Sequence, residues 1–175
     1  MEVTGIAEDG PLRSETLAPL EALYRSHAPG AVRLAYVLTG DAAAAQDIAH
    51  EAFVRVGRKL FGLRNPEQAR AYLYKTTLNL CRGRMRRLKV ERAAAERIPG
   101  PAPVVQPDPH ENDEMWEALL LLPARQRSAL FFRYYEDLSE AQAADALGCS
   151  VSAVKSLVNR GLRELRAQLE GASDD

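Results

Sequence analysis

The sequence predicts an all-α protein with two small helical domains joined by a proline-rich linker. Three observations lead to this prediction. Apolar residues recur at three- and four-residue spacing along most of the chain, which is the pattern of amphipathic helices. Five prolines fall within residues 98–110, and proline removes an amide donor and fixes φ, so no helix or central strand can cross that stretch. Residues typical of helix starts and ends flank the other apolar segments.

The proline-rich stretch divides the chain into parts. Spaced prolines favour extended polyproline II structure, in which a linker of 20 residues spans up to roughly 60 Å. The expected parts are the tail 1–15, the domain 16–91, the linker 92–111, the domain 112–170 and the tail 171–175.

The first domain begins with two amphipathic segments. Leucines at 17, 20 and 23 share a helix face, and apolar residues continue at this spacing after Pro29. A turn follows at 39–41, where Asp41 is the candidate N-cap of a second helix that ends near Leu60. That helix is expected to bury Ala45, Ile48, Ala49, Ala52, Phe53 and Val56. A loop is expected over 61–64.

The third helix has a clear start. Asn65 is its expected N-cap, Pro66 occupies the first helical position, and Gln68 can close a capping box. The helix is expected to pack Ala69, Tyr72, Leu73, Thr76 and Leu80, and to continue into a cationic stretch.

Charge is unevenly distributed along the chain. Residues 55–92 contain 12 basic and 2 acidic residues, a net charge of +10, whereas residues 1–54 and 93–175 carry −5 and −6. Ion pairs within the segment cannot neutralise such an excess, so a polyanion site is expected there. Five cations within eight positions surround most of the third helix, which excludes burial of that stretch in a core. They are Arg82, Arg84, Arg86, Arg87 and Lys89.

The second domain contains a predicted helix-turn-helix over 138–166. Ser139 and Gln142 form a capping box, and Gly148 ends the first helix in a left-handed conformation. The second helix is expected to face the core with one apolar stripe, formed by Val151, Val154, Val158, Leu162, Leu165 and Leu169. Its polar face enters the major groove in proteins with this motif, where Ser, Asn, Lys and Arg bond base edges or phosphates.

Several functional classes are disfavoured. No 18-residue apolar run or secretory leader occurs, so no membrane insertion is expected. Two cysteines, Cys81 and Cys149, are too few for a disulfide scaffold or a four-ligand zinc site, and a reducing, cytoplasmic setting is expected. The three histidines are scattered and no phosphate-binding loop or nucleophile elbow occurs, so we expect no enzyme activity, metal or cofactor.

Three strings together resemble bacterial extracytoplasmic-function (ECF) sigma factors of the sigma-70 family, in particular the short actinobacterial, SigE-like type. The strings are LYRSHAPGAVRLAYVLTGDAAAAQDIAHEAFVRV, ARAYLYKTTLNLCRGRMRR and LPARQRSALFFRYYEDLSEAQAADALGCSVSAVKSLVNRGLREL. The resemblance places sigma region 2 at 16–91 and sigma region 4 at 112–169. It implies a factor that binds core RNA polymerase, recognises the −35 and −10 promoter elements and melts the −10 region.

The resemblance also assigns residues. Those expected on the β′ clamp helices of the polymerase are Asp47, His50, Glu51 and Arg55. Those expected at the −10 element are Leu63, Arg64, Asn65, Tyr72, Asn79, Arg82, Arg84, Arg86 and Arg87. Those expected at the −35 element are Ser150, Ser152, Lys155, Ser156, Asn159, Arg160 and Arg163. Region 4 would also meet the β flap, and an anti-sigma factor stays open as a further partner.

Two alternatives stay open from the residues themselves. An autonomous helix-turn-helix regulator accounts for 138–166 but leaves the cationic block at 55–92 unused; such proteins usually dimerise on palindromic sites. A membrane-surface role for the basic helix needs more large apolar groups than 82–92 offers.

Overall fold

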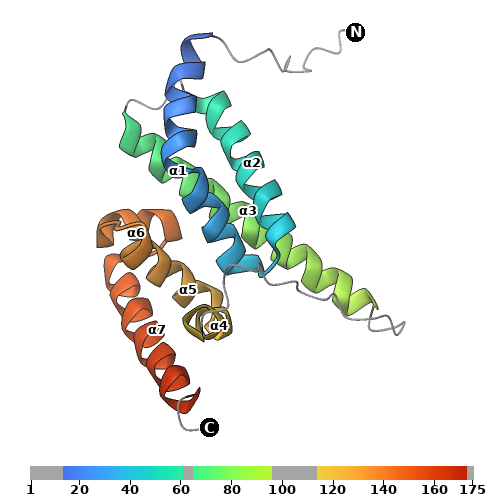
Figure 1. Cartoon of the computed structure of the whole chain (residues 1–175), viewed down its shortest axis with the longest axis vertical. Helices are drawn as coiled ribbons and strands as arrows, with labels where there is room; N and C mark the ends of the chain where they lie inside the picture. Colours follow the sequence, from blue (N-terminus) through green and yellow to red (C-terminus); the bar gives the residue numbers. More distant parts are fainter. Residues whose placement is uncertain (1–13, 61–64, 96–113, 173–175) are drawn as a thin grey trace, which may run out of the picture.

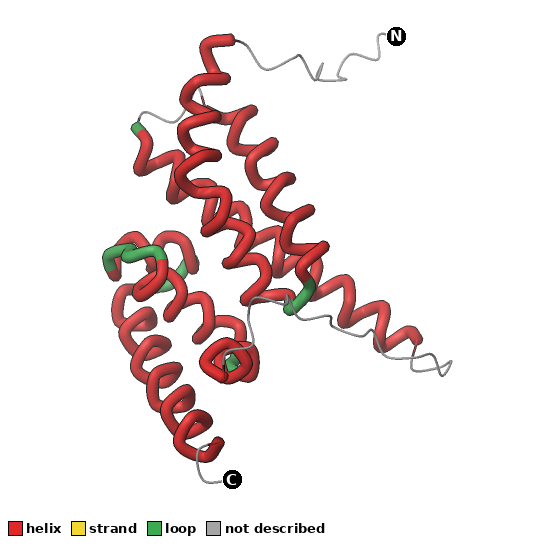
Figure 2. The backbone as a smooth tube through the Cα atoms, viewed as in Figure 1, coloured by secondary structure: helices red, strands yellow, loops and turns green. Residues whose placement is uncertain are grey.

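The computed structural model describes residues 14–60, 65–95 and 114–172, and within these ranges it contains helices and short connections but no β-strand (Figures 1 and 2). The predicted all-α class is therefore confirmed. The elements are α1 (Ser14–Thr39), α2 (Ala42–Lys59), α3 (Pro66–Ala95), α4 (Glu114–Leu121), α5 (Ala124–Leu130), the π-helical turn η2 (Phe131–Tyr135), α6 (Glu140–Leu147) and α7 (Val151–Ala172).

Helices α1, α2 and α3 pack together as a bundle, and side-chain caps set the starts of α2 and α3. Asp41 Oδ1 accepts the N–H of Ala44 at 3.0 Å, and Asn65 Oδ1 accepts the N–H of Gln68 at 2.8 Å. Both predicted caps are therefore present. The six residues that we expected α2 to bury are all buried. Helix α1 is continuous through Pro19 and Pro29.

Helices α4 to α7 form the second unit. Gln142 N donates to Ser139 Oγ at 3.2 Å, and the Gln142 side chain accepts from Ser139 N at 2.8 Å, which completes the predicted capping box. Gly148 has φ +65°, the left-handed conformation that glycine adopts without a Cβ clash. The helix-turn-helix of α6 and α7 is thus formed.

The inward face of α7 differs from the predicted stripe. Leu157 is buried, whereas Val151 and Leu162 are 38% and 36% exposed. The reason is a close approach at Gly161, where a β-carbon would lie 3.0 Å from Leu130 Cδ1 of α5. Because α5 packs on this glycine, the buried row of α7 runs through Val154, Leu157 and Gly161. Leu157 therefore belongs to the core.

Two helices run further than the sequence pattern suggested. Helix α3 continues through three alanines to Ala95, and α7 continues to Ala172. Alanine is the best helix former, so nothing in 92–95 stops the helix. The remainder of the expected linker and the expected loop at 61–64 lie outside the described residues.

The two helical units share one hydrophobic core. Buried side chains of α1 and α3 meet buried side chains of η2, α6 and α7 in a single cluster. Members from α3 are Tyr74, Leu78 and Cys81, and members from the second unit include Phe131, Phe132, Leu138, Ala144 and Leu147. Figure 1 accordingly shows α5 and α6 lying against α1 and α3. We expected two helical units joined by a linker; both units are present, and the structure adds that they pack face to face.

Candidate nucleic-acid and polymerase interfaces

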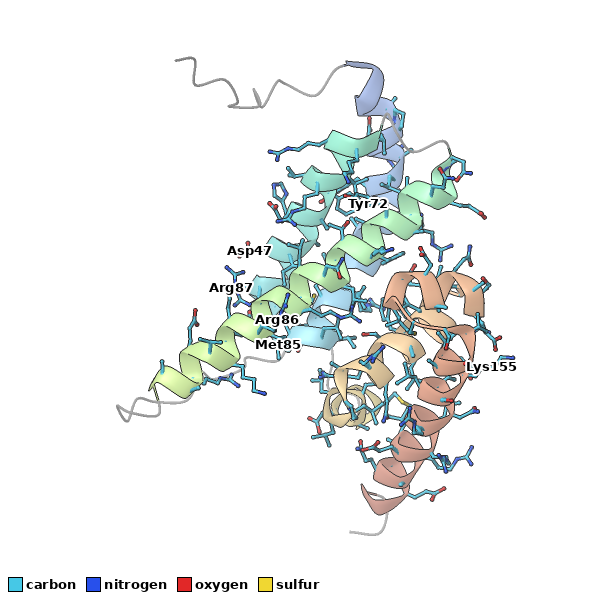
Figure 3. All side chains as sticks on the ribbon, turned by 180° about the vertical axis from the view of Figure 1, so that it is seen from behind. Asp47, Tyr72, Met85, Arg86, Arg87 and Lys155 are labelled. Atoms are coloured by element: carbon cyan, nitrogen blue, oxygen red, sulfur yellow. The ribbon has the colours of Figure 1, made fainter. Side chains whose placement is uncertain are left out.

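The cationic stretch of α3 presents only part of its charge to solvent. Arg86 and Arg87 are exposed, and with Arg55 and Asn79 they line an open surface hollow of about 660 Å³ between α2 and α3. Figure 3 shows Arg86 and Arg87 on α3. Glu91 also lines this hollow, and Arg55 pairs with Glu51, so Arg86 and Arg87 are the cations that the hollow offers to phosphates. Asn79, Arg86 and Arg87 form the open part of the predicted −10 site, which we call the α3 cationic face.

Two other arginines predicted at the −10 element bond to groups within the protein. Arg84 Nη2 lies 3.1 Å from Asp41 Oδ2. Arg82 Nη2 donates to the main-chain oxygen of Leu147 at 3.4 Å, and burial, together with the nearby charge of Arg125, lowers the pKa of Arg82. The arginines of α3 therefore fall into two sets: Arg86 and Arg87 are exposed, whereas Arg82 and Arg84 bond within the protein.

The other predicted −10 residues have different surroundings. Tyr72 is half-buried against the bundle core, and Lys59 Nζ lies 5.3 Å from its ring centroid, a cation–π distance. Asn65 uses its side-chain oxygen as the α3 cap. Leu63 and Arg64 lie outside the described residues.

The predicted polymerase contacts lie together on the outer face of α2. Asp47, His50 and Glu51 are exposed, while Phe53 points into the core as expected. Glu51 Oε1 accepts from Arg55 Nε at 2.7 Å in an exposed ion pair. Arg55 also lines the hollow of the α3 cationic face, so the two predicted surfaces adjoin.

The predicted −35 residues form one exposed face of α7. They are Ser150, Ser152, Lys155, Ser156, Asn159, Arg160 and Arg163. Ser150 Oγ accepts the N–H of Ala153 at 3.2 Å and lies 3.0 Å from Ser152 Oγ, which makes Ser150 the cap of α7. Lys155 Nζ lies 3.4 Å from Glu140 Oε2 on α6. Lys155 projects from the outer side of α7 in Figure 3, away from Arg86 and Arg87.

Sequence reasoning missed two residues at these surfaces. Val151 is exposed at the N-terminal end of α7, where an apolar side chain can contact a thymine methyl group. Its place at the helix start was the available signal, but we assigned it to the core. Arg125 of α5 lies near Arg82 of α3 and lines a hollow with it between the two units. Nothing local in the sequence links these two arginines.

The described residues also bear on metal-ligating groups, cysteines and long apolar helices. No group of three or more His, Cys, Asp or Glu side chains in 14–60, 65–95 and 114–172 is arranged to hold a metal ion. Cys81 is buried, and burial raises the pKa of its thiol to about 12. No helix in the described part of the chain is long and apolar enough to cross a membrane.

Family models match both units in chain order. The model for sigma-70 region 2 matches residues 23–90, and the model for sigma-70 region 4 matches residues 112–165. The chain is 30% identical to the RNA polymerase sigma-E factor of Streptomyces avermitilis over 156 residues, which cover 89% of this chain and 87% of that protein. It is also 30% identical to the ECF RNA polymerase sigma factor SigE of Mycolicibacterium smegmatis, over 89% of this chain and 63% of that protein.

Solved structures share the fold. The sigma factor RpoE of Bartonella quintana, determined in complex with the anti-sigma factor NepR, superposes with a TM-score of 0.69 at 22% identity, covering 89% of this chain and 94% of that one. The structure of CnrH in complex with the cytosolic domain of CnrY gives a TM-score of 0.61 at 22% identity, covering 87% and 88%.

Proposed function

Because this chain belongs to the sigma-70 family and is an ECF sigma factor of the SigE-like type, we propose that it directs promoter-specific initiation by recognising a −35 and a −10 element and melting the latter. In this role it binds core RNA polymerase in the cytoplasm and promoter DNA, and it catalyses no reaction itself.

One observation carries the proposal: regions 2 and 4 occur in family order, and each presents an exposed polar or cationic face. The α3 cationic face offers Arg86 and Arg87 to phosphates, which supports a −10 role. The exposed face of α7 offers Lys155 and Asn159 to base edges, which supports a −35 role.

Melting requires that bases leave the stack, which costs a few kcal/mol per base. Aromatic stacking and backbone neutralisation can recover that cost. Asn79 lines the same hollow as the exposed arginines, and Tyr72 lies about two helical turns before Asn79 on α3. We assign both residues to the single strand. Asp47, His50 and Glu51 on the outer face of α2 are assigned to the β′ clamp helices, and region 4 is assigned to the β flap.

The deciding experiment is transcription in vitro with core polymerase, this protein and genomic fragments, followed by 5′-end mapping. The proposal expects new start sites that share two sequence elements separated by about one and a half helical turns, roughly 50 Å. Identical start sites with and without the protein would overturn it. A symmetric footprint by the protein without polymerase would favour an autonomous regulator instead.

A matched pair of variants tests the α2 contact. Glu51→Ala and Glu21→Ala each remove the acid of an exposed i,i+4 ion pair, with N–O distances of 2.7 Å to Arg55 and 2.5 Å to Arg25. Glu51→Ala should weaken association with core polymerase severalfold, while Glu21→Ala on α1 should not. Equal effects of the two substitutions would remove the α2 assignment.

A further inference from the structure

Polar contacts as well as apolar ones join region 2 to region 4. Arg127 of α5 donates from Nη1 to the main-chain oxygen of Val37 at 2.6 Å. Lys75 Nζ of α3 lies 3.6 Å from Asp145 Oδ1 of α6. Arg33 of α1 lies over the ring of Tyr135, 4.7 Å from its centroid. With the shared core, these contacts indicate a specific docked arrangement.

The centre of this contact is a buried carboxylate. The Glu136 side chain is 9% exposed, and it enters region 2 at the backbone of Gly30. Arg70 of α3 donates from Nη2 to the main-chain oxygen of Glu136 and lies 3.5 Å from its carboxylate Oε2. A single acid of region 4 is therefore held by a cation of region 2 at both its backbone and its side chain.

Gly30 makes room for this acid. A β-carbon at residue 30 would overlap Glu136 Oε1 and lie 2.5 Å from the hydroxyl of Tyr74. Burial and the nearby Glu136 carboxylate raise the pKa of the Tyr74 phenol well above its ordinary value, so Tyr74 stays neutral beside the acid. The buried notch at Gly30 thus fits a carboxylate and leaves no space for a side chain of its own.

Backbone hydrogen bonds within region 4 also hold Glu136 in position. Its N–H donates to Phe131 O at 3.0 Å, and the N–H of Leu138 donates to Phe132 O at 2.8 Å. Between them Asp137 has φ +51°, a left-handed conformation that is uncommon for a residue with a side chain. Glu136 is therefore presented to region 2 by a tightly bonded turn.

This docking conflicts with simultaneous engagement of both promoter elements. Arg82, assigned to the −10 element, donates to Leu147 O at 3.4 Å. Ser150, assigned to the −35 element, follows Leu147 by three residues, which span at most about 11 Å. The Arg82 guanidinium therefore lies within roughly 15 Å of the Ser150 backbone, whereas the two elements lie roughly 50 Å apart.

We propose that insertion of Glu136 between Gly30 and Arg70 latches region 4 onto region 2 in the free protein, and that this latch must release before both DNA-binding faces reach their elements. The inference rests on the proposed function for its second half. DNA phosphates and polymerase surfaces would compete for Arg82 and draw region 2 away from Leu147. The latch itself is a property of the free chain.

Cys81 provides a reporter of release that is already in the protein. It is 1% exposed in the shared core and lines the hollow between α3 and α5, so undocking of region 4 uncovers it. In a Cys149→Ser background it is the only thiol of the chain. Its rate of modification by a small disulfide reagent, measured on the full-length protein without polymerase, reports the open population.

A double-substitution cycle isolates the latch. Arg70→Ala leaves the Glu136 carboxylate buried without its cation, and it should speed Cys81 modification at least about tenfold, because an unpaired buried charge strongly disfavours the docked state. Glu136→Ala should have a smaller effect, and adding it to Arg70→Ala should bring the rate back toward the parent. The matched control is the exposed pair of α1, tested with Arg25→Ala and Glu21→Ala.

Helix content and cooperative melting must match the parent in every variant used. A rescue of Arg70→Ala by Glu136→Ala supports the latch, because mere damage to the α1–α3 bundle would not be repaired by a change in region 4. Rates within twofold of the parent for both single variants would overturn it, as would additive effects without rescue.

A second arm adds core polymerase and promoter DNA. Release on engagement predicts that Cys81 modification accelerates in the bound chain and that Glu136→Ala lowers the protein concentration needed for half-maximal transcription. A chain that supports transcription while Cys81 stays as protected as in the free protein would overturn the release step. Failure to bind polymerase at all would instead overturn the proposed function, while the measurements on the free chain would still decide whether the latch exists.

Discussion

Arg84 Nη2 lies 3.1 Å from Oδ2 of Asp41, whose other oxygen, Oδ1, accepts the N–H of Ala44 at 3.0 Å. One carboxylate therefore caps α2 and pairs with a cation of α3. Both side chains of the ion pair are partly exposed, at 36% and 43%, so it contributes roughly 0.2–1 kcal/mol. The cap contributes about 1 kcal/mol and depends on the hydrogen bond rather than the charge.

Because Asp41 acts both as a cap and as an ion-pair partner, two substitutions at this residue should have unequal effects. Asp41→Ala removes both cap and ion pair, and we expect it to lower the free energy of unfolding by about 1–2 kcal/mol. Asp41→Asn keeps a cap oxygen, so its loss should stay below about 1 kcal/mol. Urea denaturation of both variants measures the difference. Equal losses would mean that the ion pair, and not the cap, carries the stability.

The exposed and the internally paired arginines of α3 should differ in DNA binding. Arg86→Ala with Arg87→Ala should weaken promoter binding by the holoenzyme across sequences, and should reduce the slope of log affinity against log salt by about 1 for each phosphate that is no longer neutralised. Arg84→Ala should change the slope less, because Asp41 already neutralises that guanidinium. Salt titrations of the three proteins provide the comparison; a slope that is unchanged in the double variant would contradict the phosphate assignment.

The face of α7 should control sequence preference. Asn159→Ala is expected to relax the preference at one −35 position, since one bidentate base contact is worth about 1–3 kcal/mol of discrimination. Lys155→Ala should act likewise, whereas Glu140→Gln, which only frees Lys155 from its 3.4 Å partner, should leave the preference intact. Selection of −35 sequences from a randomised promoter library measures each effect. Polymerase binding should stay constant throughout, and a preference identical to the parent's would refute the assignment.

Stability should fall in mildly acidic solution because of His27. Burial first, and the nearby Arg70 charge second, lower the pKa of His27 below its ordinary value of 6.5 in the native protein. Between that lowered pKa and 6.5 the unfolded chain binds more protons than the native one, so stability rises with pH across this window and is lost as pH falls through it. His27→Gln should flatten the dependence. Denaturant unfolding at about pH 7.5 and about pH 5.5 tests this; parallel curves for both proteins would remove His27 as the cause.

Local chemistry was sufficient to predict the helices and their starts. Asp41, Asn65 and Ser139 cap the helices that their positions indicated, because a cap needs only a side-chain oxygen and an N–H two or three residues ahead. Gly148 was predictable for the same reason, since its left-handed conformation ends a helix within a few residues. The exposed −35 face of α7 also follows from periodicity. Periodicity does not determine how α7 is rotated about its own axis relative to α5.

Contacts between distant segments were not predictable. Leu157 is buried because α5 approaches α7 at Gly161, and the sequence of α7 alone cannot show which of two adjacent apolar rows its neighbour covers. In the same way, Arg82 and Arg84 appeared as free cations until their partners, Leu147 and Asp41, were brought alongside.

The amino-acid sequence by itself determined the all-α class, the order of regions 2 and 4 and the cationic character of α3, because these depend on residues close together along the chain. Only the tertiary structure decided that the two regions dock and that Glu136 enters region 2 at Gly30. The physical reason is that a buried carboxylate requires a space and a cation at once, and here they come from residues 106 and 66 positions away in sequence.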